Sequence, residues 1–324
     1  MQTNLWFWII FNAGVLCVLA IDLFAFQRKA HSPSAKEAAT WTIIWITLSL
    51  GFNALVWHWM GPVKALEFLT GYLIEYSLSV DNIFVFVLIF SYFAVPAPYQ
   101  HRVLFWGILS ALVLRGIIIG LGVGFIATFH WALDFFGAFL LCVGAKMLLW
   151  GRKPINIRRN PLIRLIRNRL PVTDSYDEAH FTIRRNGRRL LTPLAMVLIM
   201  IEATDILFAV DSIPAIFGIT HDPFIVYTSN VCAVIGLRSL YFLLAGVVHR
   251  FVYLQPALAI ILSFIGVKML LADVFHIPTV ASLGFIGLVL LAAMVLSLVI
   301  KHHSPSAAPA VEPDHRSPRA SNVR

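Results

Sequence analysis

Charged residues are scarce in this sequence, and their scarcity excludes most soluble folds. Asp, Glu, Lys and Arg make up 13% of the 324 residues, whereas soluble domains carry about 25%. Hydrophobic residues make up 59% of the chain, and its mean hydropathy is +0.83. Because water cannot cover so apolar a chain, the composition predicts a polytopic membrane protein.

Cysteine is also rare, which limits the redox chemistry available. Cys17, Cys142 and Cys232 lie singly in three different apolar runs, and no Cys-x-x-Cys pair occurs. The sequence therefore encodes no dithiol centre, and the cysteines are expected to be small buried hydrophobes. The first residues also lack the positive segment and cleavage site of a secretory signal, so the first apolar run is expected to be retained.

Long apolar runs dominate the sequence instead. A transmembrane helix needs about 20 consecutive apolar residues, and we count about nine such runs. They cover residues 4–26, 40–60, 66–92, 102–128, 131–150, 191–217, 223–247, 255–272 and 277–300. We therefore expect an all-α polytopic membrane protein with about nine transmembrane helices.

Basic residues are concentrated in the connections between these runs. Residues 151–190 carry eleven Lys or Arg against three Asp or Glu, and positive charge is typical of cytoplasmic loops. With nine spans, this predicts an external N-terminus and a cytoplasmic C-terminus. The formal charge of +9 thus indicates topology, and we expect no nucleic-acid partner. Residues 161–171 are expected to form a short interfacial helix, and the tail to be disordered.

Three landmarks recur in the same order in the two halves of the chain. The matched residues are Glu75 with Asp205, Asp81 with Asp211, Asn82 with Ser212, Arg115 with Arg238, and Gly144 with Gly266. A unit of three spans must re-enter the membrane upside down. The pattern therefore predicts an inverted repeat of three plus three helices, as in many secondary transporters.

This organisation divides the chain into six segments. They are two N-terminal transmembrane helices (1–62), a first repeat (63–150), a basic cytoplasmic loop (151–190), a second repeat (191–272), a last transmembrane helix (273–300) and a disordered cytoplasmic tail (301–324). The inversion places Lys146 near the inner end of its span and Lys268 near the outer end of its span.

Carboxylates inside apolar runs are the unusual feature of both repeats. At the centre of a bilayer each ionised acid costs roughly 2.5 to 3.5 kcal/mol, and it usually marks an ion path, a proton relay or a buried pair. The candidate ligands all offer oxygen, which suits a hard divalent cation. They are Glu75, Asp81, Asn82, Glu202, Asp205, Asp211 and Ser212, with Ser79, Thr204 and Asn230 as further candidates. Arg115 and Arg238 are expected to pair with some of the acids.

A straight helix would not bring the three acids of the second motif together. Glu202 and Asp205 share a face, but Asp211 lies about 240° further round the helix. Pro214 has no backbone N–H for the carbonyl of Val210. We therefore expect local unwinding that returns Asp211 to the site, as in transporters with discontinuous helices.

These motifs resemble those of the TerC family of integral membrane proteins, over about residues 10 to 300. The resemblance is carried by residues 71–75, 79–82, 202–214, 222–230, 236–246 and 266–270. It implies a nine-span protein of the bacterial inner membrane, with a periplasmic N-terminus, related to the lysine-exporter superfamily and nearest to the pH-responsive members. Family members are linked to Mn²⁺ export, tellurium resistance and alkaline response. The motif reads Glu75-Tyr-Ser where a lysine is expected, so Glu75 is predicted to lack that internal partner.

The leading hypothesis is export of a hard divalent cation, with Mn²⁺ favoured, through an acidic midplane site in exchange for protons. The expected partners are the lipid bilayer, the cation and protons; protein partners stay undetermined. No enzymatic activity and no permanently bound cofactor are expected. Two alternatives stay open. In one, the acids form a closed charge network in a non-transporting scaffold for tellurium or envelope stress; in the other, the protein is a membrane-bound redox modulator.

Overall fold

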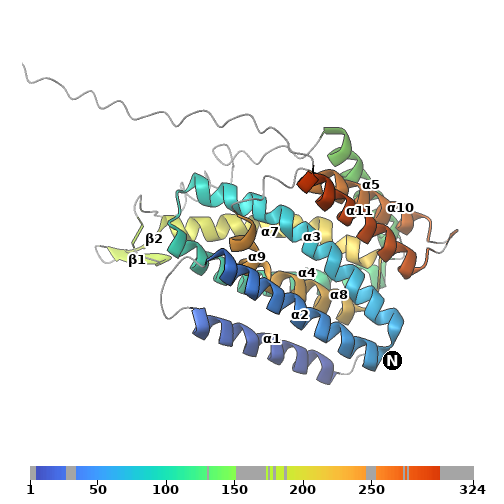
Figure 1. The fold of residues 1–324 in the computed structure, drawn as a ribbon, viewed down its shortest axis with the longest axis horizontal. Coiled ribbons are helices and arrows are strands. Elements are labelled where there is room, and N and C mark those ends of the chain that lie inside the picture. The colour runs from blue at the N-terminus through green and yellow to red at the C-terminus, as the bar shows by residue number, and fades with distance from the viewer. Residues whose placement is uncertain are drawn as a thin grey trace, which may run out of the picture.

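The computed structural model describes residues 5–26, 34–129, 131–150, 173, 176–177, 180–185, 188–245, 253–272, 274–275 and 277–299. Two predicted features, the interfacial helix at 161–171 and the disordered tail at 301–324, lie outside these residues. Within the described residues almost the whole chain is helical (Figure 1). The all-α expectation therefore holds for the spans.

Ten helices are described, and their bounds follow the apolar runs closely. They are α1 (Leu5–Phe26), α2 (Ala35–Met60), α3 (Pro62–Tyr92), α4 (Ala97–Thr128), α5 (Ala132–Trp150), α7 (Pro193–Phe217), α8 (Pro223–Ile235), α9 (Leu237–Leu244), α10 (Leu254–Leu270) and α11 (Thr279–Val299). Pro62, Pro193 and Pro223 open their helices, where a missing N–H breaks no helical bond. Asp222 caps α8 by accepting from the Phe224 amide at 3.0 Å.

A short hairpin lies within the predicted basic loop, and we did not expect it. Strands β1 (Thr182–Arg185) and β2 (Arg188–Leu191) pair antiparallel. The sequence between them is Asn186-Gly187, a pair strongly favoured in two-residue hairpin turns. The turn signal is therefore present in the sequence, although the arginines around it give the segment the composition of a charged loop.

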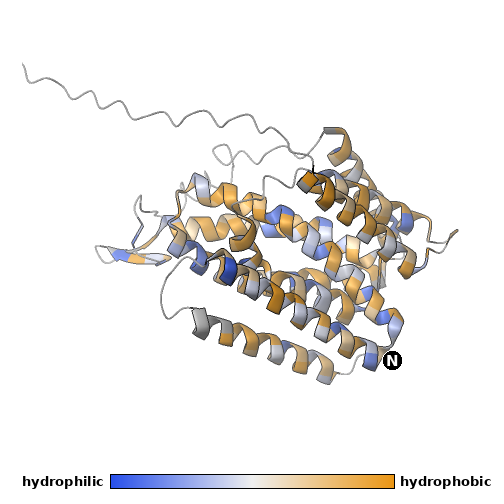
Figure 2. Cartoon of the chain, in the orientation of Figure 1, coloured by the Kyte–Doolittle hydropathy of each residue, from blue (hydrophilic) through white to orange (hydrophobic). Residues whose placement is uncertain are grey.

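The number of membrane spans stays a prediction. Among the described residues, six helices are long and apolar enough to cross a membrane, or seven if α8 and α9 form one bent span. The apolar stretches Leu5–Ile21 of α1 and Leu254–Leu270 of α10 are shorter than those six. Each of the predicted apolar runs overlaps a described helix or the α8–α9 pair, and Figure 2 shows apolar residues along all of them. The finding confirms a multi-pass membrane protein.

The helix break lies elsewhere than predicted. Helix α7 runs without interruption from Pro193 to Phe217 with Pro214 inside it, so the expected unwinding around Asp211 is wrong. Pro214 lies in the last turn of α7, where one lost backbone bond is tolerated more easily than in the helix centre. The chain bends instead between α8 and α9, by 40°. Gly236 joins these helices beside Trp45 of α2, whose Cβ would lie 3.3 Å from an added Cβ.

The helices of the two predicted repeats pack reciprocally. The repeat equates α3 with α7, α4 with the α8–α9 pair, and α5 with α10. Helix α3 packs on α8, its counterpart α7 packs on α4, and α5 packs on α10. In Figure 1, helices α3, α8, α7 and α4 run side by side in the middle of the bundle. Such exchange of equivalent contacts is the property of an interface with two-fold symmetry.

Two matched glycines make the α5–α10 contact especially close. A Cβ added to Gly144 would lie 2.7 Å from Ala259 O and would collide with Ser263. A Cβ added to Gly266 would lie 2.7 Å from both Gly137 O and Leu141 N. The alignment of Gly144 with Gly266 equates these two sets of neighbours. The reciprocity supports the predicted repeat, and small residues are what such close helix approach requires.

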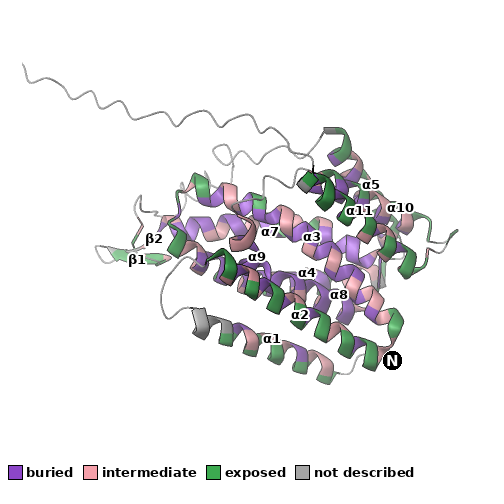
Figure 3. Ribbon diagram, in the orientation of Figure 1, coloured by how far each residue is buried: buried purple, intermediate pink, exposed green. Residues whose placement is uncertain are grey.

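Burial follows the expectation for a bundle in lipid. Figure 3 shows buried residues gathered on the central helices α3, α7, α8 and α9, with exposed residues along α1, α2 and α11. Large apolar side chains remain exposed, among them Leu121 and Leu288 at 69% each. Cys17 and Cys142 are exposed as well, so the prediction of burial is wrong for them. In a membrane protein an apolar side chain facing lipid needs no protein cover, which explains the difference.

Candidate functional site

A fully buried arginine on α4 joins four helices. Arg115 donates through Nε and Nη2 to the two carboxylate oxygens of Asp205 on α7, at 3.0 and 2.7 Å. Its Nη1 donates to Glu75 on α3 and, at 3.1 Å, to Oδ1 of Asn230 on α8. Glu75, Asn230 and Arg115 are each 0% exposed. The geometry is that of a bidentate arginine–carboxylate pair with a second acid on the remaining edge.

This network gives Glu75 a partner other than the lysine that its motif lacks. Arg115, which was expected to pair with some of the acids, pairs with Glu75. Glu75 and Asp205 are equivalent positions of the two predicted repeats. If the predicted repeat is correct, the arginine of one half holds the matching acids of both halves. One guanidinium faces two carboxylates, so the trio carries one surplus negative charge if both acids are ionised.

The other predicted ligands lie apart from this trio. Glu202 is one turn before Asp205 on α7, and its Oε1 lies 2.6 Å from Ser110 Oγ on α4. Asp81 and Asp211 are half-buried on α3 and α7, and Arg238 is buried on α9. Within the described part of the chain, no three His, Cys, Asp or Glu side chains are close enough to hold a metal ion. The predicted acids are therefore divided among several contacts in this arrangement.

Polar atoms of the predicted ligand set nevertheless remain unsatisfied in the interior. Within this set, six buried atoms have no hydrogen-bond partner among the described residues: Glu75 Oε2, Ser79 Oγ, Asn82 Nδ2, Glu202 Oε2, Ser212 Oγ and Asn230 Nδ2. Native proteins leave few buried polar groups unpaired. Ser79, Asn82 and Ser212 were proposed as ligands or further candidates from sequence. The unpaired polar atoms of these residues agree with a site that binds a polar ligand or ion.

A polar cavity at one end of the bundle was not foreseen. It has a volume of about 550 Å³, and its charged and hydroxyl lining includes Lys64, Glu67, Asp134, Thr220, Asp222 and Lys268. Thr220 Oγ1 and Lys64 Nζ both donate to Glu67 Oε2, at 2.5 and 2.8 Å, which ties the α7–α8 loop to α3. The Lys64-x-x-Glu67 spacing at a helix start was the available signal. Under the predicted topology this end is periplasmic.

Close packing separates this cavity from the buried trio. Glu67, Gly71 and Glu75 follow at four-residue spacing, so they share one face of α3. A Cβ on Gly71 would lie 2.8 Å from Ser229 Oγ of α8 and 3.4 Å from Ile216 of α7. The three helices therefore meet one turn above Glu75 and close the bundle there.

The opposite end of the bundle is held by contacts from the hairpin region. Tyr176 donates to the Phe93 carbonyl at 2.7 Å, and burial raises the pKa of the Tyr176 phenol. Arg102 of α4 lies over the Phe181 ring, 5.6 Å from its centroid, within the range of a cation–π contact. This part of the basic loop is thus fastened to the α3–α4 turn.

Comparison with known proteins places the chain among membrane proteins. A sequence model described as "Integral membrane protein TerC family" matches residues 60–304. "Uncharacterized membrane protein STKORF319" of Myxococcus xanthus is 52% identical over 300 residues, covering 93% of this chain and 94% of that protein. "Putative membrane-bound redox modulator Alx" of Escherichia coli (strain K12) is 49% identical over 301 residues, which cover 90% of this chain and 94% of that protein. No solved structure matches the chain.

Proposed function

The chain belongs to the TerC family of integral membrane proteins, and on this basis we propose that it exports a hard divalent cation. Mn²⁺ is the ion we favour, because the candidate ligands are oxygens. We place the protein in a bacterial inner membrane, with its N-terminus in the periplasm and its C-terminus in the cytoplasm. This orientation rests on the excess of Lys and Arg in residues 151–190 and the positive-inside rule.

One observation carries the proposal: the buried Arg115 holds Glu75 and Asp205 together, and these two acids are equivalent positions in the predicted repeat. Arg115 acts there as a cation attached to the protein. A divalent ion competes for the same carboxylate oxygens, and its charge balances Glu75 and Asp205 fully, whereas Arg115 balances one of them. Cation entry therefore requires Arg115 to release at least one acid, which couples binding to helix movement.

The repeats supply a route for that movement. The reciprocal packing of α3 on α8 and α7 on α4 offers two equivalent ways to open the bundle, one toward each side of the membrane. The cavity bordered by Glu67 and Thr220 is the natural release compartment, and the contact of Gly71 with Ser229 is the closure below it. Alternating access of this kind is typical of inverted-repeat transporters.

Transport by the full chain in proteoliposomes tests the proposal. We expect Mn²⁺ flux that increases with an opposing proton gradient. Asp205→Asn keeps an oxygen for Arg115 but loses a charged ligand worth about 1.5 to 3 kcal/mol, so flux at low Mn²⁺ falls by about tenfold to a hundredfold. Asp177→Asn, at an exposed carboxylate, is the matched control and keeps wild-type flux. Wild-type protein that moves no divalent ion under any gradient refutes transport and leaves the scaffold alternative.

A redox role is the second candidate, because the Escherichia coli relative is named "Putative membrane-bound redox modulator Alx". The three cysteines of this chain are all free, and they lie on α1, α5 and α8. Replacing all three with serine or alanine is the direct test. If the cysteine-free protein keeps both its Mn²⁺ flux and its phenotype in cells, thiol chemistry is not part of its function. If it keeps the flux but loses the phenotype, a separate redox role is supported.

A further inference from the structure

A charged cluster joins the two halves of the chain at the end of the bundle that holds the polar cavity. Thr220 Oγ1 and Lys64 Nζ donate to the same oxygen of Glu67, Oε2, at 2.5 and 2.8 Å. Lys64 Nζ also lies 3.6 Å from Asp222 Oδ2, and the Asp222 amide donates to Thr220 Oγ1 at 3.2 Å. We call these four residues the cavity-end latch. They tie the start of α3 to the connection between α7 and α8.

This latch lies directly above the closed part of the bundle. The Glu67 and Asp222 side chains are 12% and 15% exposed, so water competes weakly for their hydrogen bonds. One turn further along α3, Gly71 packs against Ser229 of α8. If the α7–α8 connection moves away from α3, the cavity extends past Gly71 toward Glu75. The latch therefore holds together the helices that close this end.

A second polar contact crosses between the halves at the opposite end, beside the hairpin. Tyr241 of α9 donates to Gln100 Oε1 of α4 at 2.9 Å. Gln100 Nε2 donates to the Val95 carbonyl at 3.0 Å, which fixes the orientation of the amide. The Tyr241 ring lies edge-on to Phe90 of α3, with 5.4 Å between the centroids. We call the Tyr241–Gln100 pair the hairpin-end latch.

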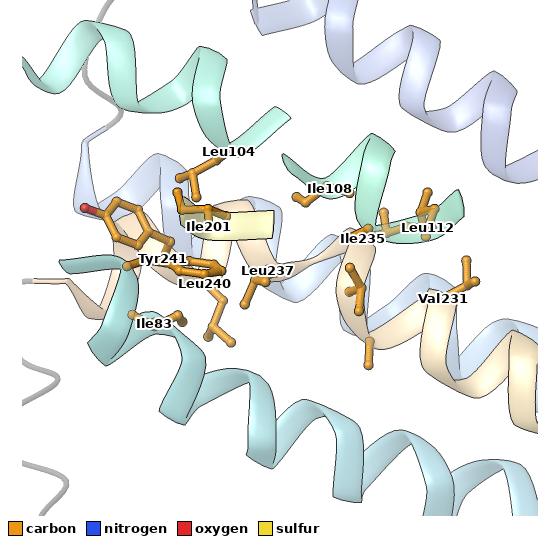
Figure 4. Close-up of a cluster of buried hydrophobic side chains, with 14 of the residues drawn as sticks. Ile83, Leu104, Ile108, Leu112, Ile201, Val231, Ile235, Leu237, Leu240 and Tyr241 are labelled. Atoms are coloured by element: carbon orange, nitrogen blue, oxygen red, sulfur yellow. The ribbon is translucent and has the colours of Figure 1, made fainter. Parts of the chain in front are cut away.

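Apolar side chains fill the space between the hairpin-end latch and the buried acids. Figure 4 shows Tyr241 at the edge of a cluster that includes Leu104 and Ile201, with its hydroxyl turned away from them. Deeper in the bundle, the cavity beside Glu202 and Asp205 measures about 10 Å³, which is at or below what one water needs. An ion therefore reaches the acids from this end only if α9 moves away from α4.

We propose that the two latches are the gates of the protein, and that both are closed in this structure. Opening the cavity-end latch separates α3 from the α7–α8 connection and links the Arg115 site to the polar cavity. Opening the hairpin-end latch separates α4 from α9 and links the same site to the other side of the membrane. The role of the gates in transport rests on the proposed export function, but their opening and closing does not.

Labelling of a buried cysteine tests the cavity-end gate. The three native cysteines are replaced by alanine, and Ser229→Cys, below the latch, is the reporter. A membrane-impermeant maleimide is applied to right-side-out and inside-out membrane vesicles. Thr220→Val or Lys64→Met removes a latch contact, so labelling is expected to rise about five- to tenfold in one vesicle orientation only. Thr128→Val is the matched control, because Thr128 is exposed and bonds Gly124 of its own helix.

A second reporter tests the hairpin-end gate. Ala111→Cys lines the small cavity on the inner side of the latch. Tyr241→Phe removes the hydroxyl that bonds Gln100, so labelling is expected to rise by a similar factor, in the opposite vesicle orientation. Tyr92→Phe, at a tyrosine of the same end that is 43% exposed, is the control and leaves labelling unchanged. Thermal unfolding of each variant checks that the chain is folded.

Two results overturn the gates. One is a labelling rate that neither Thr220→Val, Lys64→Met nor Tyr241→Phe raises. The other is an equal rise in both vesicle orientations, which means that the latches only stabilise the bundle.

Mn²⁺ flux of the same proteins separates the gates from the export function. A wild-type chain that moves no ion, but whose labelling responds to the latch variants at one end each, refutes export and keeps the gates. A chain that transports Mn²⁺, but whose labelling does not respond to the latch variants, keeps export and refutes the gates.

Discussion

Replacing Arg115 with methionine tests how far the buried charges depend on one another. The substitution removes the guanidinium that holds Asp205 by two hydrogen bonds and Glu75 by an ion pair. Removing one partner of a buried pair costs about 3 to 5 kcal/mol, and here two acids lose the same partner. We therefore expect a loss near the upper end. At about 2 °C per kcal/mol for a large domain, the unfolding midpoint falls by about 10 °C.

A compensating variant separates charge burial from lost packing. It combines Arg115→Met with Glu75→Gln and Asp205→Asn, so that no unpaired charge remains in the interior. Neutral replacement of a buried ion network is often close to neutral in stability. The triple variant is therefore expected to recover most of the loss. Unfolding midpoints of the detergent-purified proteins, followed by tryptophan fluorescence, make the comparison.

Two outcomes would refute this reasoning. A single variant as stable as the wild type would mean that Glu75 and Asp205 do not carry charge that Arg115 has to balance. A triple variant no more stable than the single one would place the loss in side-chain packing around α4. In either case the trio would cease to be a credible cation site.

Three further predictions concern packing, the outer cavity and topology. Gly266→Ala puts a Cβ 2.7 Å from backbone atoms of α5 and is expected to lower the stability by about 1 to 3 kcal/mol. Gly124→Ala, whose added Cβ has nothing within 4 Å, is the control and is expected to be neutral or stabilising. The unfolding midpoints of the two variants are compared with that of the wild type. Thr220→Val removes a hydrogen bond to Glu67 worth about 1 kcal/mol, and faster hydrogen exchange in the α7–α8 loop is the expected result. Reporter fusions at the C-terminus are expected to be active in the cytoplasm, and a periplasmic signal would contradict the predicted orientation.

Local pattern was enough for much of the architecture. Hydropathy located the apolar segments, because lipid requires about 20 apolar residues wherever a helix crosses it. The repeated acids and glycines predicted a set of equivalent positions, and the reciprocal contacts of Gly144 and Gly266 agree with that prediction. The assignment to the TerC family followed from the same motifs and is confirmed by the family match.

Which charged side chains pair with one another, in contrast, depends on how each helix is rotated about its axis and how closely it approaches its neighbours. The sequence showed several acids and two arginines but could not tell that Arg115 takes Glu75 and Asp205 together, because helix orientation about its axis is set by packing on four neighbours. Pro214 pointed to a broken α7, yet its place in the last turn leaves that helix intact. Ser110 carried no signal at all, since a serine in an apolar helix usually bonds its own backbone. Only the approach of α7 to α4 brings Glu202 within hydrogen-bonding distance of it.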